Sequence, residues 1–173
     1  SYSGKEYPTI ENNYKKVFSA ETAYQMTSIL EGVIQRGTAK KLRDLKLNIA
    51  GKTGTTNKNT DAWFIGFSSN LLVGVYVGLD NPAPLGRYET GSKTALPIFK
   101  EFVQKTLKKS DARPFKAAEG TVMMVVDPVT GQKAKFTSKN TIIEVYKKKN
   151  VINGKVLYVN RYRLDTNNIL KFY

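Results

Sequence analysis

Three strand-like runs separated by very short polar connections limit the folds that this chain can adopt. They cover Asn48–Thr56, Ala62–Phe67 and Leu71–Leu79, and each has the length and composition of a β-strand. The connection Ser68-Ser69-Asn70 has the composition of a hairpin turn. Because a parallel crossover needs about a dozen residues or more, connections this short predict an antiparallel three-strand meander.

Two amphipathic segments flank the predicted meander. Ser19 is a suitable N-cap for a helix that ends near Gly37, and a second helix is expected over Ala95–Leu107. The positions expected to be buried are Ala23, Met26, Ile29, Leu30, Val33 and Ile34 in the first helix, and Phe99, Phe102, Val103 and Leu107 in the second. A short basic segment, Lys40 to Leu47, is expected to form a partial helix.

The residues after Arg113-Pro114 have a different character. Extended segments are expected there, at Thr121 to Val126, Thr141 to Tyr146 and Lys155 to Leu164. We therefore predict two parts, residues 1–111 and a small β-rich appendage formed by residues 112–173.

Basic residues are concentrated in this appendage. The chain has 28 Lys and Arg residues against 14 Asp and Glu residues, and residues 112–173 contain 12 of the basic and 4 of the acidic ones. This excess leaves open a basic, non-catalytic binding module for nucleic acid or for an anionic wall polymer. Runs such as Lys147–Lys149 are more often solvated strand ends, and no aromatic and basic RNA-binding motif accompanies them, so nucleic acid is not favoured. A third alternative is an appendage that simply docks on the preceding part.

The chain contains no histidine and no cysteine. A Ser-His-Asp triad, a thiol nucleophile, a disulfide and a Cys/His zinc site are therefore excluded within it. We expect no metal and no cofactor, and any catalysis would rely on Ser, Thr, Lys, Tyr or a carboxylate. No run of about 18 apolar residues is present, and the start Ser1-Tyr2-Ser3 has neither an initiator Met nor an apolar signal region. We expect a piece of a longer protein.

The segment from Gly51 to Asn57, with the sequence Gly-Lys-Thr-Gly-Thr-Thr-Asn, has the most chemical content. A phosphate loop also ends in Gly-Lys-Thr, but it needs glycine where this chain has Lys46, and it runs into a helix. The alternative is a strand that lines an acyl-transfer site, where Gly54 lets substrate approach closely. Lys52 and the hydroxyls of Thr53 and Thr55 suit a substrate carboxylate. On its own the three-residue match is weak, and such a triplet more often marks a polar strand end.

The surroundings of Lys52-Thr53-Gly54 make the match far more specific. The segments that carry it are Gly32-Val33, Arg36-Gly37-Thr38-Ala39, Ala50 to Asn57, Asp61 to Phe67, Gly74 to Gly78, Asp80-Asn81-Pro82, Leu85-Gly86, Thr90-Gly91 and Ala95 to Phe99. From about Val17 to Leu107 the chain resembles the C-terminal half of the transpeptidase domain of class A, bifunctional penicillin-binding proteins. The resemblance implies an α/β (α+β) serine transpeptidase fold, similar to that of β-lactamases. The chain would hold its C-terminal portion only: helix, antiparallel three-strand meander, helix and β-rich appendage.

The resemblance also implies a function. The family cross-links peptidoglycan stem peptides as a serine D,D-transpeptidase and is acylated by β-lactams. Carried over by position, Lys52 supports the electrostatics of the site, and Thr53 and Thr55 bind the terminal carboxylate of D-Ala-D-Ala or of the β-lactam. The backbone N–H of Thr55 is expected to be an oxyanion-hole donor. Gly54 and Thr56 belong to the same substrate-binding segment.

The nucleophile is where this chain departs from the family pattern. Ser-x-x-Lys and Ser-x-Asn are expected before Lys52, and neither occurs in residues 1–51. Ser68-Ser69-Asn70 has the second pattern but follows the motif, and we interpret it as a coincidence in a turn. The chain is therefore expected to supply one wall of a transpeptidase site and to be inactive alone.

The resemblance further implies partners and a location. The parent protein is expected to carry a separate glycosyltransferase domain and to work at the periplasmic face of the bacterial inner membrane, with its anchor outside this chain. The expected partners are the stem peptide, β-lactams and the upstream half of the same transpeptidase domain. Exposed strand edges predict self-association of the isolated chain.

Overall fold

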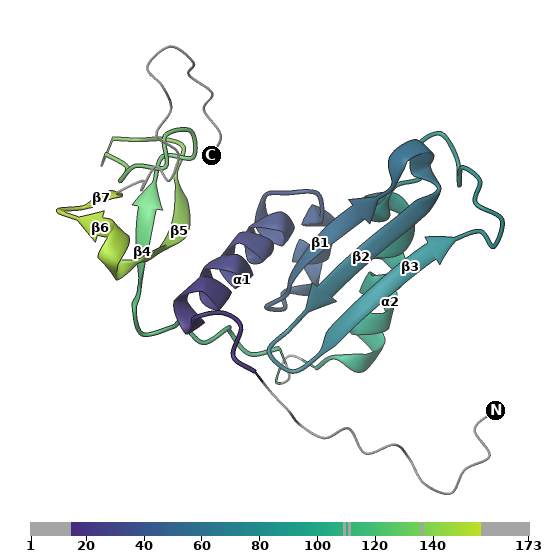
Figure 1. The fold of residues 1–173 in the computed structure, drawn as a ribbon, viewed down its shortest axis with the longest axis horizontal. Helices are drawn as coiled ribbons and strands as arrows, with labels where there is room; N and C mark the ends of the chain where they lie inside the picture. The colour runs from purple at the N-terminus through teal and green to yellow at the C-terminus, as the bar shows by residue number, and fades with distance from the viewer. Residues whose placement is uncertain (1–14, 109, 111, 136, 157–173) are drawn as a thin grey trace, which may run out of the picture.

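The computed structural model describes residues 15–108, 110, 112–135 and 137–156 (Figure 1). The described elements follow the order α1, η1, β1, η2, β2, β3, η3, α2, β4, β5, η4, β6 and β7. Helix α1 lies between a three-stranded sheet and the β4–β5 hairpin, as Figure 1 shows.

The three-stranded sheet is the predicted antiparallel meander. Its strands are β1 (Ala50–Thr55), β2 (Asp61–Phe67) and β3 (Leu72–Gly78), in the order β1-β2-β3. A 3-10 turn, η2 (Asn57–Asn59), joins the first pair, and the predicted turn at residues 68–70 joins the second. The short connections leave no room for a crossover, which is why the meander could be predicted.

Both predicted helices are present. Helix α1 spans Ala20–Gln35, and the hydroxyl of its N-cap Ser19 accepts a hydrogen bond from the N–H of Thr22 at 3.3 Å. The partial helix is a 3-10 helix, η1 (Lys40–Leu45). Helix α2 (Leu96–Thr106) follows a single π-helical turn, η3 (Gly91–Ala95), so that helical backbone begins four residues earlier than expected.

The hydrophobic core lies between α2, the end of α1 and one face of the sheet. The rings of Phe64 in β2 and Phe99 in α2 meet edge to face, with centroids 4.7 Å apart. The fully buried side chains of this core are Ile34, Leu42, Phe64, Leu96, Phe99 and Val103. The opposite face of the sheet is exposed within the described part of the chain: Trp63 retains 40% of its accessible surface and Tyr76 52%.

The predicted buried faces of the helices were partly wrong. Phe102 is 44% exposed, because α2 uses only the stripe through Leu96, Phe99 and Val103. In α1, Met26 and Ile29 are about half exposed, whereas Tyr24 and Ile34 are buried. Helix α1 contacts β1 on one side and β5 on the other, so its buried surface does not follow the single apolar stripe of its sequence.

The appendage begins with an antiparallel hairpin of β4 (Thr121–Val126) and β5 (Ile142–Lys147), which agrees with two of the predicted strands. A short 3-10 turn, η4 (Lys148–Asn150), connects it to the small pair β6 (Val151–Ile152) and β7 (Lys155–Val156). The remainder of the strand predicted at 155–164 lies outside the described residues. Among the described helices, none is long and apolar enough to cross a membrane.

Candidate functional site

Strand β1, which contains Lys52-Thr53-Gly54, forms one edge of the three-stranded sheet. The N–H of Thr56 donates to the carbonyl of Asp61 at 3.1 Å, so this pair is hydrogen-bonded across the strands. In an antiparallel pair, hydrogen-bonded and non-bonded positions alternate. The position before it, Thr55 opposite Ala62, therefore directs its N–H and C=O away from β2, toward the open edge. The same alternation turns the main chain of Thr53 outward.

Lys52 lies on the exposed face of the sheet, opposite Ile65 in β2, which in turn pairs with Gly74 in β3. Its Nζ donates to the carbonyl oxygen of Thr53 at 2.7 Å. The side chain thus lies along its own strand, with its charge at the open edge.

The hydroxyl of Thr53 has a partner that the sequence did not predict. Its Oγ1 lies 2.9 Å from Oγ1 of Thr38, which follows the end of α1. Each hydroxyl has one hydrogen and can accept two hydrogen bonds. When Thr38 donates, the hydrogen of Thr53 remains available for a further acceptor, such as a carboxylate.

The hydroxyl of Thr55 is held from the other side by Gly91. The N–H of Gly91 donates to Oγ1 of Thr55 at 3.0 Å, which leaves the hydrogen of Thr55 available to donate. A Cβ at position 91 would lie 2.4 Å from the carbonyl oxygen of Trp63 and 2.5 Å from that of Gly54. Only glycine allows this close approach of η3 to the strand.

Thr56 is engaged differently from Thr53 and Thr55. Its hydroxyl donates to Oδ2 of Asp61 at 3.0 Å and accepts from the N–H of Asp61 at 2.8 Å, which closes the β1–β2 turn. The hydroxyl of Tyr76 donates to the other carboxylate oxygen of Asp61 at 2.8 Å. This bond, together with those from Thr56 and Thr60, holds the pKa of Asp61 below its usual value, and the same Tyr76–Asp61 bond raises the pKa of Tyr76.

The loop between β3 and η3 is fastened to the same turn. The N–H of Leu85 donates to the carbonyl of Asn59 at 2.9 Å, and the Asn59 side chain donates to the carbonyl of Arg87 at 3.2 Å. Arg87 and Lys93 both lie over the ring of Tyr88, at 5.3 and 5.2 Å from its centroid.

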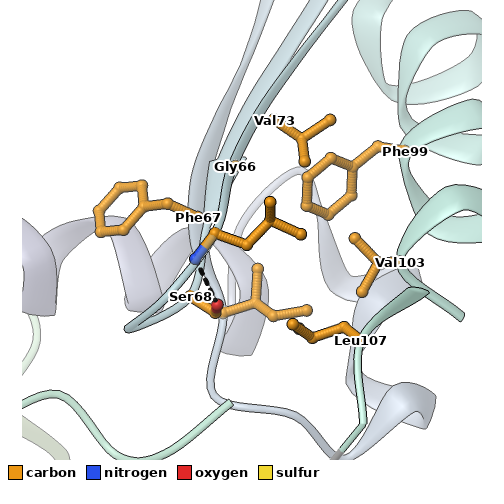
Figure 2. Close-up of a pocket in the computed structure, with 9 residues that line it drawn as sticks. Gly66, Phe67, Ser68, Val73, Phe99, Val103 and Leu107 are labelled. Atoms are coloured by element: carbon orange, nitrogen blue, oxygen red, sulfur yellow. Dashed lines mark hydrogen bonds between the residues drawn. The ribbon is translucent and has the colours of Figure 1, made fainter. Parts of the chain in front are cut away.

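Two hollows in the described structure lie away from this edge. One, of about 10 Å³, is lined mainly by apolar side chains between the sheet and α2, among them Val73, Phe99 and Val103 (Figure 2). It has the size of a single water molecule and is a packing defect of the core. The other lies against the N-terminal half of α1, next to Tyr24 and residues 115–119. The contact between Thr38 and Thr53 of β1 lies past the C-terminal end of the same helix.

The Ser-x-Asn pattern at Ser68 is part of a turn. Ser68 is buried, and its hydroxyl accepts hydrogen bonds from the N–H groups of Asn70 and Leu71, at 3.3 and 3.2 Å. The second of these bonds is the dashed line in Figure 2. It borders the small cavity at the end of β2 that is remote from Thr55. The side chain therefore serves the β2–β3 turn, as the sequence indicated.

Within the described residues, no group of three His, Cys, Asp or Glu side chains is placed to hold a metal ion. The edge of β1 instead offers one ammonium group, two hydroxyls and an outward N–H. This donor set suits an anionic oxygen ligand.

Comparison with known proteins identifies the family. Residues 5–104, more than half of the chain, match the penicillin binding protein transpeptidase domain. Penicillin-binding protein 1A of Rickettsia bellii is 43% identical over 142 residues, which are 82% of this chain and 17% of that protein. Penicillin-binding protein 1A of Pseudomonas aeruginosa is 40% identical over 134 residues, 77% of this chain and 16% of that protein.

A solved structure agrees with these relatives. The crystal structure of penicillin-binding protein 1A from Haemophilus influenzae superposes with a TM-score of 0.66 at 32% identity and covers 76% of this chain and 21% of that one. The chain thus spans about a fifth or less of the proteins it matches. Its helices and three-stranded antiparallel sheet are part of a transpeptidase fold, and the chain belongs to the penicillin-binding protein transpeptidase family.

Proposed function

We propose that this chain is part of a peptidoglycan D,D-transpeptidase and supplies the Lys-Thr-Gly wall of its site. The observation that supports this proposal is the edge of β1, where one strand carries the hydroxyls of Thr53 and Thr55 and the ammonium group of Lys52, in a chain of the transpeptidase family. The substrate carboxylate would accept hydrogen bonds from both hydroxyls. Lys52 would add a favourable charge next to it.

The outward N–H of Thr55 suits the oxyanion of an acyl-transfer intermediate. A serine hydroxyl attacks the carbonyl between the two D-Ala residues, its proton passes to a base, and the terminal D-Ala leaves with a proton on its amine. The acyl ester is then attacked by the amine of a second stem peptide, which restores the serine. Removal of one oxyanion-hole donor typically costs about 10²–10³ in turnover.

The nucleophile of this reaction lies outside the chain in the proposal. No serine of residues 1–51 is followed three positions later by lysine, and Ser68 is occupied in its turn. The upstream part of the transpeptidase domain would therefore contribute the serine and its base. The chain alone would bind substrate weakly and form no acyl-enzyme.

The wider setting follows from the relatives named penicillin-binding protein 1A. We propose that the intact protein works at the periplasmic face of the inner membrane, is acylated by β-lactams and carries a separate glycosyltransferase domain. Its anchor and that domain would both lie in sequence outside these 173 residues.

Labelling with a fluorescent penicillin tests the proposal. The intact protein that contains this segment should form a covalent adduct, and peptide mapping should place it upstream of the segment. The isolated segment at the same concentration should show no adduct. Absence of label on the intact protein, or a label on a residue of the segment, would contradict the proposed role.

A further inference from the structure

The end of α1 contacts both the Lys-Thr-Gly strand and the appendage. On one side, Oγ1 of Thr38 lies 2.9 Å from Oγ1 of Thr53. On the other, the guanidinium of Arg36 forms an ion pair with the carboxylate of Glu144 in β5. Only Gly37 separates the two contacting residues in the sequence.

The backbone between these contacts is fixed to the last turn of α1. The N–H of Gly37 donates to the carbonyls of Gly32 and Val33, at 3.1 Å each, and the N–H of Ala39 donates to the carbonyl of Val33 at 3.1 Å. Ala39 is itself fully buried. Arg36 and Thr38 are therefore parts of one rigid helix end, and a displacement of either is transmitted to the other.

The side chain of Arg36 passes over Gly32 on its way to the ion pair. A Cβ at this position would lie 2.8 Å from the Cζ atom of Arg36, so the arginine side chain runs back along the helix over the glycine. In this conformation its guanidinium reaches β5.

Two more contacts hold β5 along the length of α1. The side-chain amide of Gln25 donates to the carbonyl of Val145 at 3.0 Å, and Nζ of Lys147 donates to the hydroxyl of Thr22 at 2.6 Å. Lys147 belongs to the basic run that the sequence offered as a binding surface, and here it serves this internal contact. The hairpin is thus attached near the beginning and at the end of α1.

We propose that Thr38 is a positioning residue for the hydroxyl of Thr53, and that the β4–β5 hairpin holds Thr38 in place through the Arg36–Glu144 ion pair. The inference rests on the proposed function, because it assumes that Thr53 binds a substrate carboxylate. With Thr38 as the donor of this pair, Oγ1 of Thr53 is held in place and its single hydrogen is free to point at the carboxylate. The appendage therefore takes part in forming the site without touching substrate.

The test measures acylation of the intact protein by benzylpenicillin and by its methyl ester, which lacks the carboxylate charge. Thr38→Val should slow acylation by the free acid about 10-fold, because Thr53 loses the bond that orients its hydroxyl toward the charged carboxylate, and should leave acylation by the ester unchanged. Thr38→Ser should restore the rate with the acid to within about 2-fold, because it keeps the hydroxyl. Glu144→Gln alters no residue near the ligand. It should slow acylation by the free acid by about 3-fold and leave acylation by the ester unchanged.

Matched controls remove the same groups elsewhere. Thr106→Val removes a hydroxyl at the end of α2, and Glu101→Gln removes the exposed ion pair with Lys105. Both should acylate like the wild type. If the wild type itself is not acylated, the proposed function and this inference fall together.

With an acylated wild type, three results would overturn the inference alone. The first is a Thr38→Val variant that is acylated as fast as Thr106→Val. The second is a Thr38→Val variant in which acylation by the acid and by the ester is slowed equally. The third is a Glu144→Gln variant with the wild-type rate, which would remove the part assigned to the hairpin. Because Glu144→Gln keeps Thr38 intact, it also provides a test if the valine variant does not fold.

Discussion

The backbone N–H of Gly91 donates a hydrogen bond to the hydroxyl of Thr55, and no side chain fits between the two segments that carry them. The turn before α2 is therefore in direct contact with the strand of the candidate site. Gly91→Ala should displace β1 or η3, because the added methyl group would overlap the carbonyl oxygens of Trp63 and Gly54. We expect acylation by penicillin to fall at least about 10²-fold, as a 1 Å misplacement can cost.

Gly74→Ala is the control for this change. A Cβ at position 74 would meet only Ile65, at an ordinary contact distance of 3.9 Å. Stopped-flow acylation of the two intact variants would compare them directly. Equal rates for both would show that the closeness of Gly91 to the strand has no consequence for the site.

The hydrogen bond between Tyr76 and Asp61 predicts a pH-dependent contribution to stability. The folded-state pKa of Asp61 is lowered, so the stabilisation is present above its unfolded value near 3.8 and is lost as the pH falls through the folded value. The folded-state pKa of Tyr76 is raised, so the stabilisation is present below its usual value near 10.0 and is lost as the pH rises through the folded value. Tyr76→Phe should therefore be destabilising at neutral pH and nearly neutral at both extremes.

Thermal unfolding of the wild type and of Tyr76→Phe across this pH range would measure the effect. The phenylalanine ring keeps the packing on Trp63, whose ring centroid lies 4.6 Å away. Tyr88→Phe makes the same chemical change on an exposed ring and should show no such profile. A constant difference between the wild type and Tyr76→Phe at every pH would mean that the hydroxyl acts without the carboxylate.

Phe99 is the aromatic anchor of α2 on the sheet. It is 1% exposed, packs on Phe64 and leaves no room for a side chain at Gly66. Phe99→Ala should lower the free energy of unfolding by about 3–5 kcal/mol, through lost transfer energy and a cavity. Phe102→Ala, three residues along the same helix but 44% exposed, should cost clearly less. Denaturant titration of both variants would give the two values, and a similar loss for each would place the core elsewhere.

The isolated segment should associate with itself through the open face and edge of its sheet. In the described part of the chain, β3 is an edge strand, and Leu72 at its start is 69% exposed. Leu72→Lys should shift the segment toward the monomer, because a charge on an edge strand opposes pairing between copies. Light scattering would follow the mass.

Val129→Lys is the matched control, since Val129 is 91% exposed but lies in the turn of the appendage. It adds the same charge without touching the sheet. A wild-type segment that is monomeric, or an equal effect of both lysines, would exclude association through β3.

Much of the fold could be predicted because it depends on local signals. The turn at Ser68 and the short β1–β2 connection dictate an antiparallel meander, and the Ser19 cap marks the beginning of α1. The buried face of α1 could not be predicted in the same way. It is decided by β1 and β5, which flank the helix from different directions, so that Met26 is exposed although it lies on the apolar stripe.

The sequence indicates the residues of the candidate site but not the contacts that hold them in place. Lys52, Thr53 and Thr55 stand out as a motif on one strand, but their partners are small residues far along the chain. Thr38 and Gly91 are 15 and 36 positions from the hydroxyls they contact, and no local pattern in the sequence links either residue to its partner. A glycine directly before a helix was the one available signal, and glycine is common at such positions whether or not a strand lies against it.

Main-chain groups along β1 point alternately toward β2 and toward the open edge. The number of residues in this strand is therefore more critical to the site than the identity of any one side chain. A single residue inserted into or deleted from β1 between Lys52 and the turn at Asp61 would slip the strand by one position against β2. Every group on β1 beyond that point would then exchange faces and edges: the N–H of Thr55 would turn toward β2, and its hydroxyl would leave Gly91. Insertions and deletions in this short stretch are thus the class of mutation that the site tolerates least, even where the sheet itself still forms.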